Sequence, residues 1–287
     1  KFAFRRPLGL RGGRTRARQP PQRPRGGPWP LEGVRGGKAR TDGSERTNKE
    51  NVHYHYDVSN AFYRLWLDRQ LVYSCAYFPT DEATLDDAQT AKLEHICRKL
   101  RLRPGERFLD IGCGWGALLF VAAQQYGVDA TGITLSRNQF DYVNSEIAAR
   151  GLADRVRVEL RDYVDLPEDT LYDKIASVGM FEHVGAARFP NYFGKIRRIL
   201  TPGGLVLNHG ITHNPLGTHS LGSGLGDFVE DYVFPGGELV HVSEVIAGMV
   251  AQGLEVIDAE ALREHYAKTL WHWCERLEAN ADAARAE

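Results

Sequence analysis

The stretch that most constrains the fold is residues 107–116, which read RFLDIGCGWG. Its apolar residues Phe108, Leu109 and Ile111 are typical of the end of a buried strand. Three glycines at alternate positions follow, and the apolar run 117–123 predicts a helix that packs back on the strand. A strand, a glycine turn and a helix N-terminus together bring the backbone close to a ligand. The stretch therefore predicts an α/β fold with a binding site at this turn.

The glycines Gly112, Gly114 and Gly116 have the spacing G-x-G-x-G. This spacing differs from the G-x-G-x-x-G of dinucleotide-binding loops, and no phosphate-binding loop of the G-x-x-x-x-G-K-[ST] type is present. The acidic Asp110 precedes the glycines, where a carboxylate can hold a ligand amine or orient the loop. The loop resembles the cofactor loop of S-adenosylmethionine-dependent methyltransferases. The alternative is an ordinary tight turn between a strand and a helix.

Residues 1–48 differ in composition from the rest of the chain. They are rich in Arg, Gly and Pro and show no apolar periodicity, which predicts a disordered basic tail. Such a tail could attract anionic lipid headgroups or nucleic acid by its charge. The plainer interpretation is a solvated tail or a wrongly assigned start of the gene, and we expect no nucleic-acid partner.

The rest of the composition narrows the class of protein. The chain has no apolar run of about 20 residues, so we expect no transmembrane helix, and its amino end lacks the pattern of a signal peptide. The four cysteines form no C-x-x-C pair and no metal-binding pattern; they are Cys75, Cys97, Cys113 and Cys274. These features predict a cytoplasmic protein without a metal site.

From residue 107 onwards, short apolar runs alternate with helical patterns. This alternation predicts a parallel, doubly wound sheet with ligands bound at the carboxyl ends of its strands. Residues 107–287 form the expected core domain, with a Gly-rich insertion over 212–237. Strands are predicted over 107–112, 129–135, 156–160, 174–179, 205–209 and 254–259, and helices over 116–126, 137–150, 189–200 and 243–252.

Residues 49–106 are expected to form a helical segment ahead of this core. Residues 60–68 combine helical spacing with dense aromatic side chains, which predicts either a lid helix over a pocket or a helix that covers the core. A second helix is predicted over 85–100. Its N-cap is Thr84, and Asp87 three residues later makes the pattern close to a capping box.

Further motifs carry a more specific resemblance. Together with the glycine loop they occur in the order of the cyclopropane-fatty-acyl-phospholipid synthase family, which includes the mycolic acid cyclopropane synthases and related lipid methyltransferases. The motifs are YSCAYF at 73–78, GITLSRNQ at 132–139, GMFEHVG at 179–185, FPGG at 234–237 and HYAKTL at 265–270. The resemblance covers residues 51–279.

The resemblance implies a Rossmann-like class I methyltransferase fold and a reaction. In that reaction a methyl(ene) group passes from S-adenosylmethionine to a cis double bond in an acyl chain of a phospholipid, and a cyclopropane ring forms. Such a protein would meet its lipid as a peripheral protein at the inner face of the membrane. A homodimer is left open.

Other functions stay open beside this one. A related methyltransferase could make a methyl-branched or a methylene lipid, or could N-methylate a small amine as related plant enzymes do. A nucleic-acid-binding protein could act through its basic tail. A catalytically inactive remnant is the last alternative.

The resemblance also implies a base. An alkene is a poor nucleophile and needs no activation by a base, but methyl transfer leaves a carbocation that must lose a proton. In the family, a bound bicarbonate ion takes this proton. Its ligands here would be Cys75, Glu182, His209 and Tyr266, with backbone from Ile211.

Each of these residues also has a plainer interpretation. Cys75 could be a small buried thiol, and Glu182 could be a carboxylate at the start of a helix. Tyr266 could be a core side chain of its helix. The match at His209 is less close, and we expect His183 to be structural.

The implied cofactor contacts lie at the strand ends. Asp110 and the three glycines would take the methionine part, and Tyr73 and Ser74 would close over it. Most Rossmann-like methyltransferases end the second strand with an acid that binds the ribose, whereas this family uses Thr-Leu-Ser and a glutamine there. The expected contacts are Tyr73, Ser74, Asp110, Gly112, Gly114, Gly116, Thr134, Leu135, Ser136, Gln139, Asp162 and Tyr163.

The chain departs from the family at both ends. Larger bacterial synthases carry an additional amino-terminal domain, where this chain has only the basic tail. The chain stops at Glu287 within a helix-like run, whereas family members continue with helices and a last antiparallel strand. We therefore expect a C-terminal truncation that removes this strand and leaves the predicted strand 254–259 without its neighbour.

Overall fold

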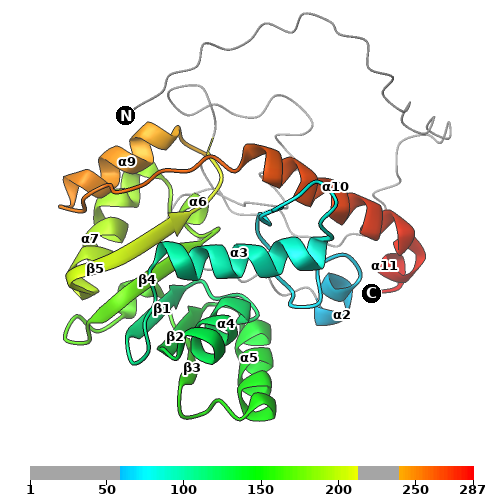
Figure 1. Ribbon diagram of the computed structural model, residues 1–287, viewed down its shortest axis with the longest axis horizontal. Coiled ribbons are helices and arrows are strands. Elements are labelled where there is room, and N and C mark those ends of the chain that lie inside the picture. Colours follow the sequence, from blue (N-terminus) through cyan, green and yellow to red (C-terminus); the bar gives the residue numbers. More distant parts are fainter. Residues whose placement is uncertain (1–58, 213–238) are drawn as a thin grey trace, which may run out of the picture. The chain divides into compact units, whose positions relative to one another are not determined.

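A five-stranded parallel sheet forms the centre of the computed structural model, which describes residues 59–212 and 239–287 (Figure 1). The strand order is β3-β2-β1-β4-β5, and every pair of neighbours is parallel. The strands are β1 Arg107–Ile111, β2 Asp129–Thr134, β3 Val156–Leu160, β4 Tyr172–Val178 and β5 Leu200–His209. The order reverses between β1 and β4, so the predicted doubly wound sheet is confirmed.

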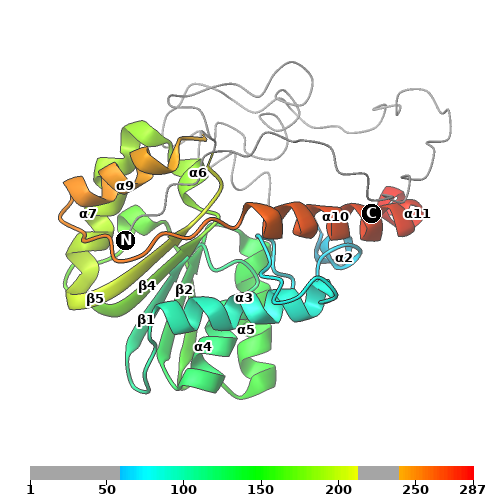
Figure 2. The ribbon, with the colours of Figure 1, turned by 45° about the horizontal axis from the view of Figure 1, so that its top comes forward.

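Helices cover both faces of the sheet (Figure 2). On one face, apolar side chains of α3, α4 and α5 pack on the strands; on the other face, those of α7 and α9 do so. The helices are α3 Leu85–Lys99, α4 Ala117–Tyr126, α5 Arg137–Arg150, α7 Phe189–Ile199 and α9 Val242–Ala251. The central strand β1 is buried from Phe108 to Ile111, as expected for a sheet covered on both faces, whereas the edge strand β3 alternates buried and exposed residues.

Two helices begin where polar side chains satisfy the free amides of their first turn. The Thr84 hydroxyl accepts from the Asp87 amide at 3.2 Å and donates to the Asp87 carboxylate at 2.6 Å, so the predicted cap of α3 is confirmed. The Ser136 hydroxyl caps α5 by accepting from the Gln139 amide at 3.2 Å.

The prediction that the fifth strand begins at residue 205 is wrong. The strand β5 begins at Leu200, and residues 201–204 bulge out of the ladder, because Tyr172 pairs with Leu200 while Lys174 pairs with Leu205. Gly203 has a positive φ of 77°, and a side chain on Gly204 would lie 2.8 Å from the Asp173 carbonyl. The Pro-Gly-Gly sequence therefore makes a bulge inside the strand.

The predicted strand 254–259 is also wrong, since these residues form no strand. A strand needs a neighbour for its backbone hydrogen bonds, and among the described residues no strand lies beyond β5. Side chains hold the segment instead: Asp258 and Glu260 both pair with Lys99, and Glu260 also lies 2.8 Å from His95. No antiparallel strand is present in the described part of the sheet.

A third apolar cluster joins the segment before α3 to the end of the chain. It contains Tyr63, Trp66, Trp115 and Trp273. Trp115 belongs to the glycine loop, and its indole N–H donates to Asn60 at 2.7 Å. The helices of this region are α2 Asn60–Arg64, α10 Arg263–Ala279 and α11 Ala281–Ala286. The helix predicted over 60–68 is thus shorter than expected.

Two predicted regions lie outside the described residues. These are the basic tail 1–48 and residues 213–237 of the predicted insertion, with its motif at 234–237. Within the described part, no helix is both long and apolar enough to cross a membrane.

Replacement of Thr84 by Ala tests the cap of α3. Loss of an N-cap costs about 1 kcal/mol of unfolding free energy, which we expect to measure by urea denaturation. Thr80→Ala is the matched control, because Thr80 is exposed and lies before the helix. Equal stability of the two variants would contradict the capping role.

Candidate active site

A pocket opens at the carboxyl ends of β1, β2 and β4. The empty space in this pocket, including the part that is open to solvent, is about 990 Å³. Every predicted cofactor residue except Gly116 lines it: Tyr73, Ser74, Asp110, Gly112, Gly114, Thr134, Leu135, Ser136, Gln139, Asp162 and Tyr163. The structure therefore brings together residues that are spread over the chain from 73 to 163.

The glycine loop forms the floor of this pocket. Gly112, Gly114 and Gly116 have φ angles of 78°, 55° and 82°, in the left-handed region that favours glycine. A Cβ on Gly114 would meet nothing within 4 Å, so the backbone there borders open space. A Cβ on Gly116 would lie 3.1 Å from Phe120 and from Val143, so Gly116 serves packing beneath the loop.

Asp110 is the buried acid of the pocket. Its side chain is 3% exposed, and its Oδ1 atom has no hydrogen-bond partner among the described residues. Burial raises the pKa of Asp110 to about 7, and the nearby Lys92 opposes this rise. A buried carboxylate oxygen at the pocket wall is a position where a ligand amine would be stabilised.

The end of β2 presents a ring of small polar groups. The Thr134 hydroxyl donates to the Gln139 side-chain oxygen at 2.7 Å and accepts from the Ser136 amide at 3.1 Å. Both bonds are buried and fix Gln139 at the start of α5. The sequence lacks an acid at this strand end. The Thr134 hydroxyl and the side-chain amide of Gln139, held by these bonds, lie there instead.

Beyond β3, Asp162 and Tyr163 complete the wall. Asp162 Oδ1 accepts from the Val164 amide at 3.0 Å, which starts a short 3₁₀ turn. The Tyr163 ring meets Tyr192 edge-on with centroids 5.0 Å apart. These contacts fix the two residues in place beside the pocket.

The predicted cover of the pocket, Tyr73 and Ser74, is held by α3. The side-chain amide of Gln89 donates to the backbone carbonyls of Val72 at 3.2 Å and Ser74 at 2.9 Å. The Lys92 ammonium donates to the Ser74 hydroxyl at 2.8 Å. The side chains of Gln89 and Lys92 are almost fully buried.

Sequence reasoning missed Lys92 as a pocket residue. The signal was available, because Leu85, Gln89, Lys92 and Ile96 follow the 3.6-residue period of one helix face, and all four are buried. A lysine on the buried face of a helix needs a polar partner. Met180 and His183 also line the pocket, although we expected His183 to be structural.

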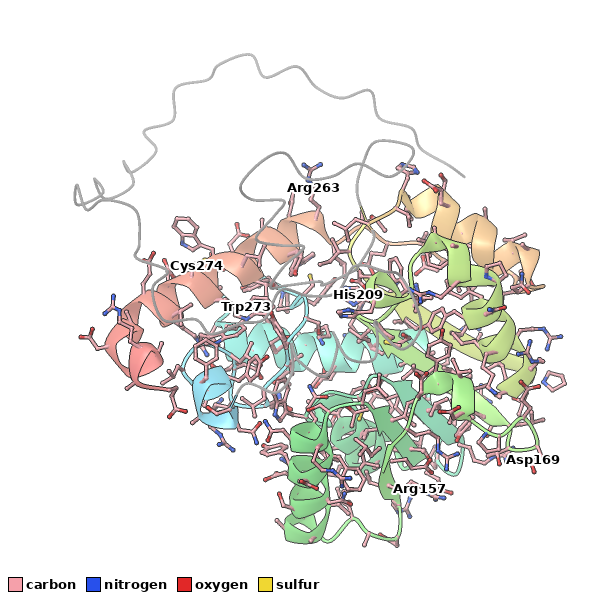
Figure 3. All side chains as sticks on the ribbon, turned by 180° about the vertical axis from the view of Figure 1, so that it is seen from behind. Arg157, Asp169, His209, Arg263, Trp273 and Cys274 are labelled. Atoms are coloured by element: carbon pink, nitrogen blue, oxygen red, sulfur yellow. The ribbon has the colours of Figure 1, made fainter. Side chains whose placement is uncertain are left out.

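The four predicted ligands of the base do not line this pocket, but they adjoin it. Cys75 follows Ser74, and Glu182 precedes His183 on the short helix α6 Phe181–Val184. His209 ends β5 and Tyr266 lies near the start of α10; Figure 3 shows His209 at the end of the sheet that faces α10. Electrostatic interactions link Tyr266 with both Cys75 and Glu182.

Glu182 is the most deeply buried member of this group. Its side chain is 1% exposed, and its Oε1 atom accepts from the Ile211 amide at 2.7 Å. The Ile211 amide, expected to bind bicarbonate, is thus bonded to Glu182 itself. The Oε2 atom of Glu182 has no partner among the described residues. Burial raises the pKa of Glu182 to about 7.

Burial also keeps the other three groups uncharged at neutral pH. It lowers the pKa of His209 to about 4, and it raises the pKa of Cys75 to about 11. The pKa of Tyr266 is raised as well, first by burial and then by Tyr73, Glu182 and Cys75. Cys75, His209 and Tyr266 are therefore uncharged hydrogen-bonding side chains beside the pocket, whereas the carboxyl of Glu182 titrates near neutral pH.

Glu182→Gln should change how stability depends on pH. The carboxyl pKa rises from 4.5 to about 7 on folding, so the folded state keeps a proton between these values that the unfolded chain releases. The unfolding free energy of the wild type should therefore fall by roughly 3 kcal/mol more than that of the variant as the pH rises from 4.5 to above 7. Urea denaturation across this range measures the difference, with the exposed Glu255→Gln as control. Parallel curves for wild type and Glu182→Gln would contradict the shift.

Similar proteins are found by sequence. The chain is 50% identical over 247 residues to a probable fatty acid methyltransferase of Pseudomonas putida, which covers 86% of the chain and 63% of the relative. It is 42% identical over 244 residues to the probable fatty acid methyltransferase Rv3720 of Mycobacterium tuberculosis, which covers 85% of the chain and 56% of the relative. The chain thus spans 63% and 56% of the lengths of these relatives.

Solved structures share the fold. The cyclopropane synthase MmaA2 of Mycobacterium tuberculosis superposes with a TM-score of 0.78 at 36% identity, over 83% of this chain and 86% of that one. The mycolic acid cyclopropane synthase CmaA1, complexed with SAH and CTAB, gives 0.76 at 37% identity over the same shares. Coclaurine N-methyltransferase, bound to N-methylheliamine and SAH, gives 0.70 at 27% identity over 83% of this chain and 71% of that one.

A family model described as mycolic acid cyclopropane synthetase matches residues 43–287. The match covers the sheet, the glycine loop and all the residues that line the pocket. The fold, the pocket and this match agree, and the chain belongs to the mycolic acid cyclopropane synthetase family.

Proposed function

We propose that this chain is the methyltransferase part of an enzyme that modifies lipids. The reaction is transfer of a methyl(ene) group from S-adenosylmethionine to a cis double bond in an acyl chain of a phospholipid, with closure of a cyclopropane ring. The observation that carries the proposal is the arrangement of the site. A pocket with a buried acid and a glycine loop adjoins a group of hydrogen-bonding side chains, of which Cys75 and Glu182 are buried and only Glu182 titrates near neutral pH.

The pocket fits S-adenosylmethionine by the chemistry of its wall. The unpartnered Asp110 oxygen matches the ligand's ammonium, and the open space at Gly114 admits a ligand against the backbone. Tyr73, Ser74, Asp162 and Tyr163 line the same pocket. When bound, the cofactor supplies an electrophilic methyl group. The chain's residues orient it and exclude water.

The group of hydrogen-bonding side chains suits the second half of the reaction. A carbocation formed from an alkene must be kept from water until it loses a proton, and Cys75, His209 and Tyr266, which carry no charge at neutral pH, provide such surroundings. Cys75, Glu182, His209 and Tyr266 would hold bicarbonate, whose chemistry is that of a base. Glu182 fits the role of a bicarbonate ligand that holds or relays the proton, because with a pKa of about 7 its carboxyl can hold or release a proton near neutral pH.

A lipid substrate is supported by the names of the relatives, which are probable fatty acid methyltransferases. The exposed apolar side chains Leu270 and Trp271 on α10 suit contact with a membrane surface, with Trp271 62% exposed. We propose a cytoplasmic protein that meets its lipid at the inner face of the membrane.

One alternative has its own support. The likeness to coclaurine N-methyltransferase favours methylation of a small amine as the second candidate. A methyl branch or a methylene group on a lipid is a third outcome of the same fold. Mass spectrometry separates amine products from lipid products, and NMR separates a ring from a methylene, which have the same mass.

Gly114→Val tests cofactor binding. The β-branched side chain would enter the open space at Gly114, so calorimetry should detect no binding of S-adenosylmethionine. Gly151→Val is the matched control: its φ of 63° imposes the same backbone strain, its Cβ also meets nothing within 4 Å, and it ends α5 away from the pocket. Unchanged affinity in Gly114→Val would contradict the assignment.

Glu182→Gln tests the proton acceptor. The variant keeps the shape of the side chain and an oxygen for the Ile211 amide, so it should still bind the cofactor. Turnover on vesicles with monounsaturated acyl chains should fall roughly 10²–10⁴-fold, the range for positioned acid–base groups. Added bicarbonate should restore part of the loss if the defect is weaker anion binding. Wild-type turnover of the variant in bicarbonate-depleted buffer would remove the anion-site model.

A further inference from the structure

Lys92 is a buried cation at the wall of the pocket, and the proposed reaction gives it no role. Its side chain on α3 is 3% exposed, and the charges of Asp68 and Asp110 both act on it. It lines the same pocket as Asp110 and Ser74.

The hydrogen bond between Lys92 and Ser74 has a defined direction. An ammonium group can only donate, so the Ser74 oxygen accepts from Lys92 at 2.8 Å. The proton of the Ser74 hydroxyl must then point away from the lysine. The Ser74 carbonyl is held separately by Gln89 at 2.9 Å, which fixes the backbone that carries the hydroxyl.

The pocket therefore offers a donor and a cation on one wall and a carboxylate on another. Ser74 and Lys92 belong to the wall made by residues 71–74 and α3, whereas Asp110 lies near the end of β1. A ligand with one ammonium and one carboxylate matches both sets of groups at once: the ammonium suits Asp110, and the carboxylate suits Ser74 and Lys92.

We propose that Lys92 is a positioning residue, which turns the Ser74 hydroxyl proton towards the ligand's carboxylate and adds a positive charge behind it. This inference rests on the proposed function, because the carboxylate is that of the methionine part of the cofactor. Lys92 acts through Ser74 and does not take part in methyl transfer.

The charges around Lys92 are consistent with this role. Burial lowers the pKa of Lys92 to about 8, against the opposing effects of Asp68, Cys75 and Asp110. The lysine thus still carries its charge at neutral pH. A ligand carboxylate next to Ser74 adds a negative charge that stabilises this charge further.

The test uses three ligands that differ in one group at a time. S-adenosylhomocysteine carries the ammonium and the carboxylate, its decarboxylated analogue carries the ammonium alone, and 5′-methylthioadenosine carries neither. Calorimetry compares wild type with Lys92→Met, Ser74→Ala and the double variant. Lys99→Met is the control, because Lys99 lies on the same helix and pairs with Asp258 and Glu260 outside the pocket.

We expect Lys92→Met and Ser74→Ala each to weaken binding of S-adenosylhomocysteine by about tenfold to a hundredfold, the effect of losing a charge-assisted hydrogen bond. The double variant should lose little more than either single variant, since both remove one interaction. Binding of the decarboxylated analogue and of 5′-methylthioadenosine should change less than threefold. Ser74→Ala tests the same interaction from its other side should Lys92→Met fail to fold.

Three results would overturn the inference. An equal loss for all three ligands would make Lys92 a structural residue only. Unchanged binding of S-adenosylhomocysteine in both single variants would remove the carboxylate contact while leaving the proposed function intact. Absence of binding of every ligand to the wild type would overturn the proposed function, and this inference with it.

Discussion

The site depends on one carbonyl at the end of β2. The Ile133 carbonyl accepts from the amides of both Gly112 and Cys113 at 3.0 Å, which fastens the glycine loop to the neighbouring strand. Gly132 makes this possible, because a Cβ there would lie 2.5 Å from the Leu119 side chain and 2.8 Å from the Cys113 sulfur. The absence of a side chain at Gly132 in β2 thus allows the glycine loop and α4 to pack against the sheet, and the pocket forms above them.

Much of this architecture was predictable because it is local. The strand β3 and the helix α5 occur within the predicted bounds, since periodic apolar residues and capping groups define them in sequence. The start of β5 and the segment 254–259 were predicted wrongly, because a bulge and a strand both depend on what lies opposite. Lys92 was missed for a related reason: a charged residue on a buried helix face has meaning only once its partner is known.

Contacts between distant parts of the chain complete the site, and no local pattern predicts them. The amides of Ala76 and Phe78 donate to Thr269 at 2.9 Å and to His265 at 3.0 Å, so α10 holds the segment that carries Cys75. The Tyr77 ring stacks between His95 and His265, with centroids 4.4 and 4.7 Å away. The motifs at 73–78 and 265–270 therefore act as one unit, and the segment 73–78 is held between α3 and α10.

Burial favours the uncharged form of each group in both halves of the site, but nearby charges oppose it to different extents. In the pocket, the charges of Lys92 and Asp110 oppose the effect of burial on each other, and their pKa values are about 8 and about 7. In the neighbouring group, burial leaves His209 and Cys75 uncharged because no opposite charge offsets it enough. Ser74, which accepts from the Lys92 ammonium, and Cys75, which is uncharged at neutral pH, are neighbours in the sequence. A cofactor with a charged amino-acid part and a reaction through an unsolvated cation need these two halves of the site side by side.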